Sequence, residues 1–299
     1  MRKYFIFNPK AGEDTNRTNI LNRIKPLIND RDTFIYYTKG HKDATRFVEE
    51  TIRLNKDNKL LFIACGGDGT MNEVFTPCVN KDNVYVSLLP CGSGNDFIKC
   101  FEHNDIDTIL TLDENNVKKI DVLKVNDYYS FNMVNFGFDT TVAVQVQKDR
   151  ENRGKGSNLA YVKGVIMALF KSMHYQGTIT ADGTVLNPDG EFMLCTCANG
   201  QYVGGMFKCS PKAKLDDGLI DVCIVRPVSR LKFIQLVGVY AKGEHLTNPK
   251  LEKYITYTRC TEVEINTSKD FAYSLDGEII YGEHLSIKLM KNALNILTK

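Results

Sequence analysis

The sequence has no excess of charge of either sign. Its 38 Lys+Arg against 36 Asp+Glu leave a net charge of +2 over 299 residues. Proteins dedicated to nucleic-acid binding usually carry a strong basic excess, so this composition disfavours that function. Low-complexity segments and internal repeats are also absent, which disfavours long disordered stretches. The 43% of apolar and 25% of charged residues are typical of a soluble globular protein, for which this length favours two domains.

The sequence also lacks an apolar run long enough to cross a bilayer, which takes about 20 residues. The longest mostly apolar stretch, Leu159 to Phe170, is interrupted by Lys163 and favours a core helix over a membrane anchor. The first residues, MRKYFIFNPKAG, indicate a strand and lack the longer apolar segment and cleavage site of a signal peptide. These absences predict a cytoplasmic protein without a transmembrane segment.

Cysteine spacings that hold zinc are absent. The nine cysteines include no Cys-x-x-Cys pair, and the five histidines are scattered, whereas a zinc site needs closely spaced ligands. Nine is an odd number, so the cysteines cannot all pair within one chain. We therefore expect reduced, mostly buried thiols.

Strand and helix patterns alternate over roughly the first 125 residues. We expect strands at 3–7, 33–37, 60–64 and 83–89, and helices at 19–28 and 42–54. The continuous apolar run from Leu60 to Ala64 suits a strand that is covered on both faces. This alternation predicts a parallel α/β domain over residues 1–125.

The pattern changes after about residue 125. Short strands are expected at 131–138, 178–180, 192–197, 219–225, 261–265 and 285–289, with helices near 159–173 and 231–240. Turn dipeptides such as Asp182-Gly183, Asp189-Gly190 and Asp276-Gly277 separate the strands. Runs of short strands of this kind predict an antiparallel, sandwich-like or barrel-like domain over residues 126–289.

Three of the expected strands in the first half run into polar loops that contain glycine. These loops are Asn8-Pro9-Lys10-Ala11-Gly12, Gly66-Gly67-Asp68-Gly69-Thr70 and Gly92-Ser93-Gly94-Asn95-Asp96. Ligands of open parallel sheets bind at the carboxyl ends of the strands. Glycine lets the backbone approach a ligand closely, and backbone N–H groups there bind anions such as phosphate. The three loops therefore indicate a ligand that carries phosphate groups.

Several common phosphate-binding and catalytic motifs are missing. The nearest approach to a Walker A loop, ending in Gly154-Lys155-Gly156-Ser157, has Asp149 where the first glycine is needed. The dinucleotide fingerprint is incomplete because Phe97 stands at its last glycine position. The protein-kinase signatures His-Arg-Asp and Asp-Phe-Gly and the Gly-x-Ser-x-Gly nucleophile elbow are absent too.

Five short motifs together resemble a known family. They are Asn8-Pro9-x-x-Gly12, Gly66-Gly67-Asp68-Gly69-Thr70, Gly92-Ser93-Gly94-Asn95-Asp96-Phe97, Leu215-Asp216-Asp217-Gly218 and Asp276-Gly277-Glu278. Their order along essentially the whole chain is similar to that of the diacylglycerol kinase catalytic family, and most similar to its soluble bacterial members. Sphingosine kinases are similar as well, and NAD kinases share the Gly-Gly-Asp-Gly-Thr segment.

The resemblance implies an architecture of two domains. The first would be a three-layer α/β nucleotide-binding domain like that of phosphofructokinases and NAD kinases, and the second a β-sandwich. The family also implies that residues 290–299 return to the first domain. ATP would lie in the cleft between the domains, together with Mg²⁺.

The resemblance also implies roles for individual residues. Asp68, Glu278 and Asp217 would be catalytic, with Asp68 near the phosphates and linked to magnesium and Glu278 as the general base for a lipid hydroxyl. The nucleotide would be held by Asn8, Pro9, Lys10, Gly12, Thr38, Gly66, Gly67, Asp68, Gly69, Thr70, Asn72, Glu73, Gly92, Ser93, Gly94, Asn95 and Asp96. A structural magnesium site would use the side chain of Asp216 or Asp217 with the backbone carbonyls of Leu215 and Ile220.

The sequence departs from the family pattern at three places. Ser93 stands for the usual threonine, Lys99 for arginine, and Gly204-Gly205-Met206 for three glycines. Lysine lacks the bidentate fork of arginine, while the third change concerns the shape of the lipid or interdomain region. Without the resemblance, Asp276-Gly277 would be read as an ordinary hairpin turn.

The function implied by the resemblance is transfer of phosphate from ATP to a lipid hydroxyl, with diacylglycerol as the leading acceptor and phosphatidic acid as the product. Sphingoid bases and ceramide stay open as acceptors, as do two other functions: an NAD kinase, and a nucleotide or lipid sensor without turnover. The lipid substrate would lie in a membrane, so the enzyme would bind the membrane surface reversibly. A homodimer also stays open.

Overall fold

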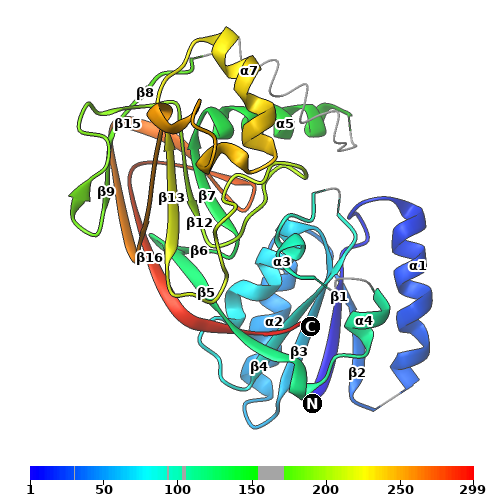
Figure 1. The fold of residues 1–299 in the computed structure, drawn as a ribbon. Helices are drawn as coiled ribbons and strands as arrows, with labels where there is room; N and C mark the ends of the chain where they lie inside the picture. Colours follow the sequence, from blue (N-terminus) through cyan, green and yellow to red (C-terminus); the bar gives the residue numbers. More distant parts are fainter. Residues whose placement is uncertain (30, 93, 103–105, 154–171) are drawn as a thin grey trace. The chain divides into compact units, whose positions relative to one another are not determined.

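The computed structural model describes residues 1–29, 31–92, 94–102, 106–153 and 172–299. By their contacts these residues form two compact units, Met1–Val122 with Lys291–Lys299 and Leu123–Met290 (Figure 1). Most of the helix expected over 159–173 lies outside the described residues. The expected fold class is confirmed, because the first unit is α/β and the second is like a β-sandwich.

The first unit contains a parallel sheet. Its strands are β1 (Arg2–Phe7), β2 (Thr33–Tyr37), β3 (Leu60–Gly66) and β4 (Val84–Pro90), in the order β4-β3-β1-β2. All seven residues of β3 are buried, as its continuous apolar sequence requires. The end of the long strand β16 (Glu278–Leu297) pairs in parallel with β4, with Asn295 opposite Tyr85. The side-chain amide of Asn295 donates to the carbonyls of Lys81, Asp82 and Val84, which ties the last strand to this sheet.

Short helices connect the strands of the first unit. They are α1 (Asp14–Ile24), α2 (Asp43–Leu54), α3 (Asp68–Phe75) and α4 (Ile106–Leu110), with 3₁₀ turns η1 (Lys25–Asn29), η2 (Thr76–Cys78), η3 (Phe97–Cys100) and η4 (Glu114–Asn116). The helix expected at 19–28 begins earlier and gives way to 3₁₀ geometry at Lys25. Pro26 has no N–H to continue the α-helical pattern, so the shift is explained by local chemistry.

The second unit is mainly antiparallel. Its strands are β5 (Val117–Val125), which begins in the first unit, β6 (Tyr128–Ser130), β7 (Met133–Gly137), β8 (Tyr175–Gln176), β9 (Thr178–Ala181), β10 (Thr184–Val185), β11 (Glu191–Phe192), β12 (Leu194–Ala198), β13 (Ile220–Val225), β14 (Ile255–Cys260), β15 (Glu262–Leu275) and most of β16. Strand β15 pairs first with β9 and later with β7, and its register with β16 shifts between Asn266 and Phe271. Such an irregularity lets one long strand serve both layers of a sandwich.

Two longer helices belong to the second unit, α5 (Phe138–Arg153) and α7 (Arg230–Ala241), along with η5 (Glu244–Leu246) and η6 (Glu252–Tyr254). Helix α7 matches the helix expected at 231–240, and the hydroxyl of Ser229 caps it by accepting from the Lys232 N–H. The strand expected at 131–138 ends at Gly137, where α5 follows directly. Gly137 has a φ of +93°, and a Cβ there would lie 2.4 Å from the carbonyl oxygen of Met193, so only glycine fits this turn.

The cysteines are reduced and mostly buried, as expected. All nine cysteines are free, and all except the half-buried Cys100 are buried. Burial raises the pKa of several thiols, including Cys91 to about 12, which makes them poor nucleophiles.

Within the part of the chain that the structure describes, no helix is long and apolar enough to cross a membrane.

Candidate functional site

The three glycine loops meet at the carboxyl edge of the parallel sheet in the first unit. Asn8, which follows β1, donates from its side-chain amide to the hydroxyl of Thr70 at 3.0 Å and from its backbone N–H to Cys65. The N–H of Cys91, after β4, donates to the carbonyl of Gly66 at 2.9 Å. These bonds join the first loop to the second and the second to the third. The topology therefore assembles segments that lie far apart in the sequence.

Contact between the loops leaves no space for a side chain at two glycines. A Cβ on Gly92 would lie 2.5 Å from the Cα of Gly67, and one on Gly12 would lie 1.6 Å from the carbonyl oxygen of Cys91. Gly12 also has a φ of +60°, which favours glycine on its own account. The loops thus pack backbone against backbone.

Asp68 joins the second loop to the third. Its Oδ1 accepts from the backbone N–H groups of Asp96 at 2.9 Å and Phe97 at 3.3 Å. Its Oδ2 would lie 3.2 Å from a Cβ on Gly94, so the absence of a side chain there keeps space beside this oxygen. Asp68 is also the first residue of α3, where the helix dipole favours negative charge.

The third loop is held by polar contacts of its own. Lys99 donates to the carbonyl of Gly94 at 2.9 Å and pairs with Asp96 at 2.8 Å, so the lysine that replaces arginine still bridges the loop. Asn95 has a φ of +50° and donates to Gly92 at 2.7 Å. Its side-chain oxygen is buried, and the described residues offer it no hydrogen-bond donor. Ser93 lies outside the described residues.

The remaining nucleotide candidates have local partners. The N–H of Thr38 donates to the carbonyl of Phe7, which extends the strand pairing. The side-chain oxygen of Asn72 accepts from Thr76, and the carboxylate of Glu73 accepts from the Lys42 N–H at 2.8 Å. Lys42 has a φ of +60° at the start of α2, so Glu73 holds that helix start in place. Lys10, by contrast, donates its N–H to Asn8 within an exposed turn.

In the second unit, Asp276 is the centre of a dense set of hydrogen bonds. Its carboxylate accepts from the hydroxyl of Ser130 at 2.7 Å and from the N–H groups of Phe131, Asn132 and Met133 at 2.8–3.0 Å. Asp276 and Gly277 have φ angles of +49° and +96°, which fits a tight hairpin turn between β15 and β16. The turn is thereby fixed to β6 and β7, and with it the exposed Glu278 that follows.

Beside the segment proposed for structural magnesium, the structure places a second carboxylate, Asp221, that was not among the expected ligands. Asp216 is exposed, whereas Asp217 lies near the buried Asp221, whose side chain has no exposed surface. Tyr257 donates its hydroxyl to Asp221, and burial raises the pKa of the Asp221 carboxyl. The guanidinium of Arg259 lies 3.4 Å from Asp217 and 3.5 Å from Asp221.

This pair has limited capacity for a cation. The Oδ2 atoms of Asp217 and Asp221 are buried and accept no hydrogen bond from the residues the structure describes, but the Asp217 Oδ2 is the atom that lies 3.4 Å from the Arg259 guanidinium. Among the described residues no group of three or more His, Cys, Asp or Glu side chains is placed to hold a metal ion. Arg259 supplies one positive charge to two carboxylates, so the cluster retains acceptor capacity of the kind that Mg²⁺ uses. Leu215 and Ile220 are buried at either side of the loop.

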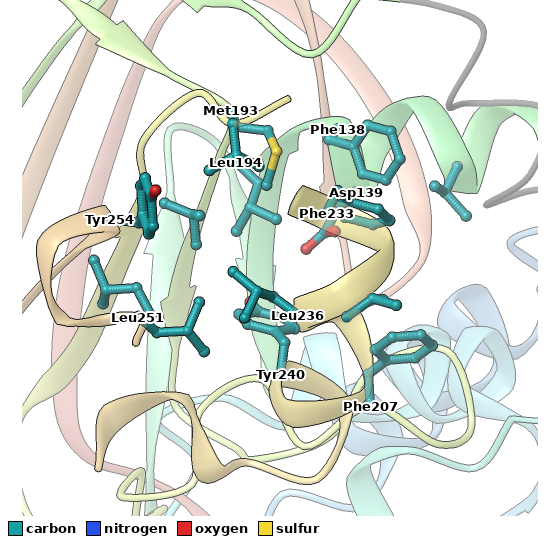
Figure 2. A pocket seen from close by; sticks show the side chains of 15 residues that line it. Phe138, Asp139, Met193, Leu194, Phe207, Phe233, Leu236, Tyr240, Leu251 and Tyr254 are labelled. Atoms are coloured by element: carbon teal, nitrogen blue, oxygen red, sulfur yellow. The ribbon is translucent and has the colours of Figure 1, made fainter. Parts of the chain in front are cut away.

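One cavity of the second unit is almost entirely apolar. It has a volume of about 50 Å³ and lies between α5, α7, β12 and β13 (Figure 2). Its walls are formed by Phe138, Asp139, Val142, Met193, Leu194, Phe207, Val225, Val228, Phe233, Leu236, Val237, Tyr240, Leu251, Tyr254 and Ile255. Ligand pockets commonly have volumes of about 300–1,000 Å³, so this cavity is smaller than a typical binding site and would have to widen to admit a ligand.

Asp139 is the one carboxylate among the residues that line this cavity. Its Oδ2 is buried and has no donor among the described residues, and burial raises the pKa of the carboxyl to about 7. Figure 2 shows the carboxyl group among the apolar side chains. Asp139 is therefore in part protonated near neutral pH and is then able to donate a hydrogen bond.

Sequence reasoning missed two buried acidic residues, Asp139 and Asp221. It also missed the structural role of Asp276. Asp139 follows Gly137-Phe138 at the end of an expected strand, a position where functional side chains often lie. Asp221 is the second residue of an apolar strand, Ile220–Val225, and a charged residue in such a strand needs a partner. These sequence positions are weak signals, because the role of each residue depends on its burial in the fold, which the local sequence does not show.

Comparison with known proteins supports the resemblance over the whole chain. Residues 2–125 match the diacylglycerol kinase catalytic domain, and residues 132–298 match the YegS C-terminal NAD kinase beta sandwich-like domain. The chain belongs to the diacylglycerol kinase family. It is therefore a kinase, and the glycine loops lie in the part that matches the catalytic domain.

Named relatives agree with this assignment. A diacylglycerol kinase of Bacillus subtilis is 29% identical over 283 residues, covering 93% of this chain and 89% of that protein. One of Staphylococcus aureus (strain JH9) is 29% identical over 301 residues, covering 99% and 90%. A solved structure of a diacylglycerol kinase from Bacillus anthracis, with 22% identity and a TM-score of 0.73, covers 100% of this chain and 97% of its own. A second B. anthracis structure has 25% identity, a TM-score of 0.78 and the same coverage.

Replacement of Asp276 by alanine tests the turn that carries Glu278. The change removes the acceptor of four hydrogen bonds and leaves three backbone N–H groups without it, so we expect a loss of about 3 kcal/mol or more in the free energy of unfolding. Urea unfolding measures the loss. Asp270→Ala, which changes an exposed aspartate of β15, is the control and should change the free energy by less than about 0.5 kcal/mol. Equal effects of the two changes would contradict the assignment.

The raised pKa of Asp139 predicts a pH dependence of stability. An unfolded aspartate ionises near pH 3.9, whereas the folded state keeps the proton up to about pH 7. Between these values the folded state binds the extra proton, so stability falls as pH rises, by about 1.4 kcal/mol per pH unit at most. We expect wild-type protein to lose stability relative to Asp139→Asn over this range, measured by urea unfolding at a series of pH values. Identical pH profiles would show that Asp139 ionises normally.

Proposed function

We propose that this protein is an ATP-dependent lipid kinase that converts diacylglycerol to phosphatidic acid. The observation that carries the proposal is the apolar lining of the cavity beside Asp139, because the family membership explains a kinase whereas an apolar lining suits a lipid acceptor. A dinucleotide acceptor would call for polar groups along the walls, and the lining side chains are nearly all apolar. The catalytic-domain match and the named relatives support the same acceptor.

The nucleotide phosphates would bind at the three glycine loops. Backbone N–H groups of these loops and the N-terminus of α3 supply donors and a favourable dipole. Lys10 lies in the exposed first loop and would add positive charge, and the unpaired oxygen of Asn95 would accept a hydrogen bond from the ligand or its water. Asn8, Thr38, Asn72 and Glu73 would act through the loop and helix contacts that they make.

Phosphoryl transfer would rely on Asp68 and Glu278. Mg²⁺, when bound, supplies charge neutralisation at the phosphates, and Asp68 would hold it through the oxygen that faces Gly94. Glu278 would accept the proton of the lipid hydroxyl as its oxygen forms a bond to the γ-phosphorus. The bond between the γ-phosphorus and the bridging oxygen breaks, and ADP leaves with that oxygen. Asp276 would keep Glu278 in position through its fixed turn.

A structural cation would bind at Asp217 and Asp221. Mg²⁺ prefers carboxylate and carbonyl oxygens, and the two buried Oδ2 atoms provide the first kind. The backbone carbonyls of Leu215 and Ile220 would provide the second. Arg259 already balances part of the charge, so the cation would complete a cluster that the guanidinium leaves negative.

The lipid would place an acyl chain in the apolar cavity. The protonated carboxyl of Asp139 would then donate a hydrogen bond to an ester oxygen, so the one carboxyl group among the lining residues would orient the lipid. The lipid lies in a membrane, so the enzyme would act at the membrane surface and bind it reversibly.

A transfer assay tests the proposal. Wild-type protein with γ-labelled ATP, Mg²⁺, NAD and mixed micelles of diacylglycerol should place label in the organic phase after extraction. Asp68→Asn and Glu278→Gln should each lower the rate at least 100-fold, since a positioned base contributes about 10²–10⁴. Glu283→Gln, an exposed glutamate on the same strand, should keep the wild-type rate. Circular dichroism confirms that each variant is folded.

The other outcomes separate the alternatives. Label in NADP would establish an NAD kinase and contradict the lipid acceptor. Label in neither phase, with ATP bound, would favour a sensor without turnover. Wild-type rates in Glu278→Gln would remove its assigned role as base.

A further inference from the structure

Helix α7 carries large apolar side chains on two opposite sides. Phe233, Leu236 and Tyr240 face inward and line the apolar cavity (Figure 2). Leu231 and Ile234 face outward, and 76% and 58% of these residues are exposed. A helix on the surface of a globular protein normally has a single apolar stripe. The packing of the residues that the structure describes therefore leaves the second apolar side of α7 unexplained.

Basic residues surround the exposed apolar side chains. Arg230 and Lys232 flank Leu231, and Lys242 follows the end of the helix. The helix sequence RLKFIQLVGVYA contains no acidic residue. A shallow hollow at the start of the helix, lined by Met173, His174 and residues 228–231, adjoins Leu231. Apolar side chains among positive charges are the composition of segments that bind anionic lipid surfaces.

We propose that the outer face of α7, defined by Arg230, Leu231, Lys232 and Ile234, docks on the surface of an anionic lipid bilayer. The proposal rests on the proposed function, since it places the lipid acceptor beside the cavity that would take it. Leu231 and Ile234 enter the acyl region, and the two basic side chains contact lipid phosphates. The inner side of the same helix forms a wall of the cavity. When the helix is docked, only its own width therefore lies between the bilayer and the cavity.

The charge pattern favours a membrane over a second copy of the chain as the occupant. A dimer that paired α7 with α7 would bring Arg230 and Lys232 of one protomer near their counterparts in the other, and like charges repel. An anionic bilayer instead supplies phosphates for these side chains and acyl chains for Leu231 and Ile234. Both features of the face are then satisfied by one partner.

Vesicle sedimentation tests the proposal without any substrate. The protein is mixed with vesicles of phosphatidylcholine and phosphatidylglycerol, and separately with phosphatidylcholine alone, in the absence of nucleotide and diacylglycerol. The double variant Leu231→Asp/Ile234→Asp should lower partitioning to the anionic vesicles at least 10-fold. Arg230→Gln/Lys232→Gln should remove most of the preference for anionic vesicles and its salt dependence. Leu54→Asp, on a residue that is 67% exposed in the other unit, should bind as wild type does.

Kinase activity separates this proposal from the proposed function. On a short-chain diacylglycerol below its critical micelle concentration, both α7 double variants should keep the wild-type rate, whereas on vesicles their rates should fall with binding. If no diacylglycerol is phosphorylated by any variant, the proposed function fails while sedimentation still reports on the face.

Three results would overturn the docking proposal. The first is wild-type protein that does not bind anionic vesicles. The second is equal binding by Leu231→Asp/Ile234→Asp and Leu54→Asp. The third is a double variant that turns a dimer into a monomer in sedimentation velocity while its vesicle binding is unchanged, since a second copy would then cover the face.

Discussion

The contact between Gly67 and Gly92 is the constraint on which the first unit's site depends. Two loops that follow neighbouring parallel strands approach so closely that a single Cβ on Gly92 would meet backbone at 2.5 Å. Asp68 then accepts hydrogen bonds from the third loop, and Asn8 joins the first loop to Thr70. The parallel sheet supplies the common edge, and glycine supplies the space. Close packing of backbone against backbone at the three loops follows from these two conditions together.

A comparable constraint holds the Asp276-Gly277 turn of the second unit in place. Asp276 sits in a hairpin turn that could be an exposed tip, yet its carboxylate accepts from four donors at the start of β7 and the segment before it. The neighbouring Glu278 gains a fixed position from this arrangement. Asp139 and Asp221 are also buried carboxyl groups. Each must therefore either be paired with a positive group or be protonated.

Sequence patterns predicted a large part of this fold. The alternating elements and the apolar run at Leu60–Ala64 predicted the parallel sheet, and the glycine spacing predicted three loops at one edge, which the structure brings together. The five ordered motifs predicted the family, which is confirmed. The roles of individual site residues stay predictions, since geometry alone does not show a bound nucleotide or metal.

Other features depend on contacts between distant residues and were not predicted. The strands expected at 261–265 and 285–289 run much further, to Leu275 and from Glu278, because pairing with each other and with β7 extends them beyond their apolar segments. The apolar cavity is assembled from α5, α7 and two strands, so no local pattern encodes it. Asp221 was missed because its partners Tyr257 and Arg259 lie on β14, more than thirty positions later.

The most direct measurement is the affinity of the protein for Mg²⁺-ATP by isothermal titration calorimetry, with Gly92→Ala as the test and Gly238→Ala as the control. A Cβ at Gly238 meets no atom within 4 Å, so that change should leave binding as in wild type. The account predicts that wild type and Gly238→Ala bind the nucleotide and that Gly92→Ala, still folded by circular dichroism, binds at least 10-fold more weakly. Wild-type affinity in Gly92→Ala, or no binding by the wild type, would contradict a phosphate site at the glycine loops.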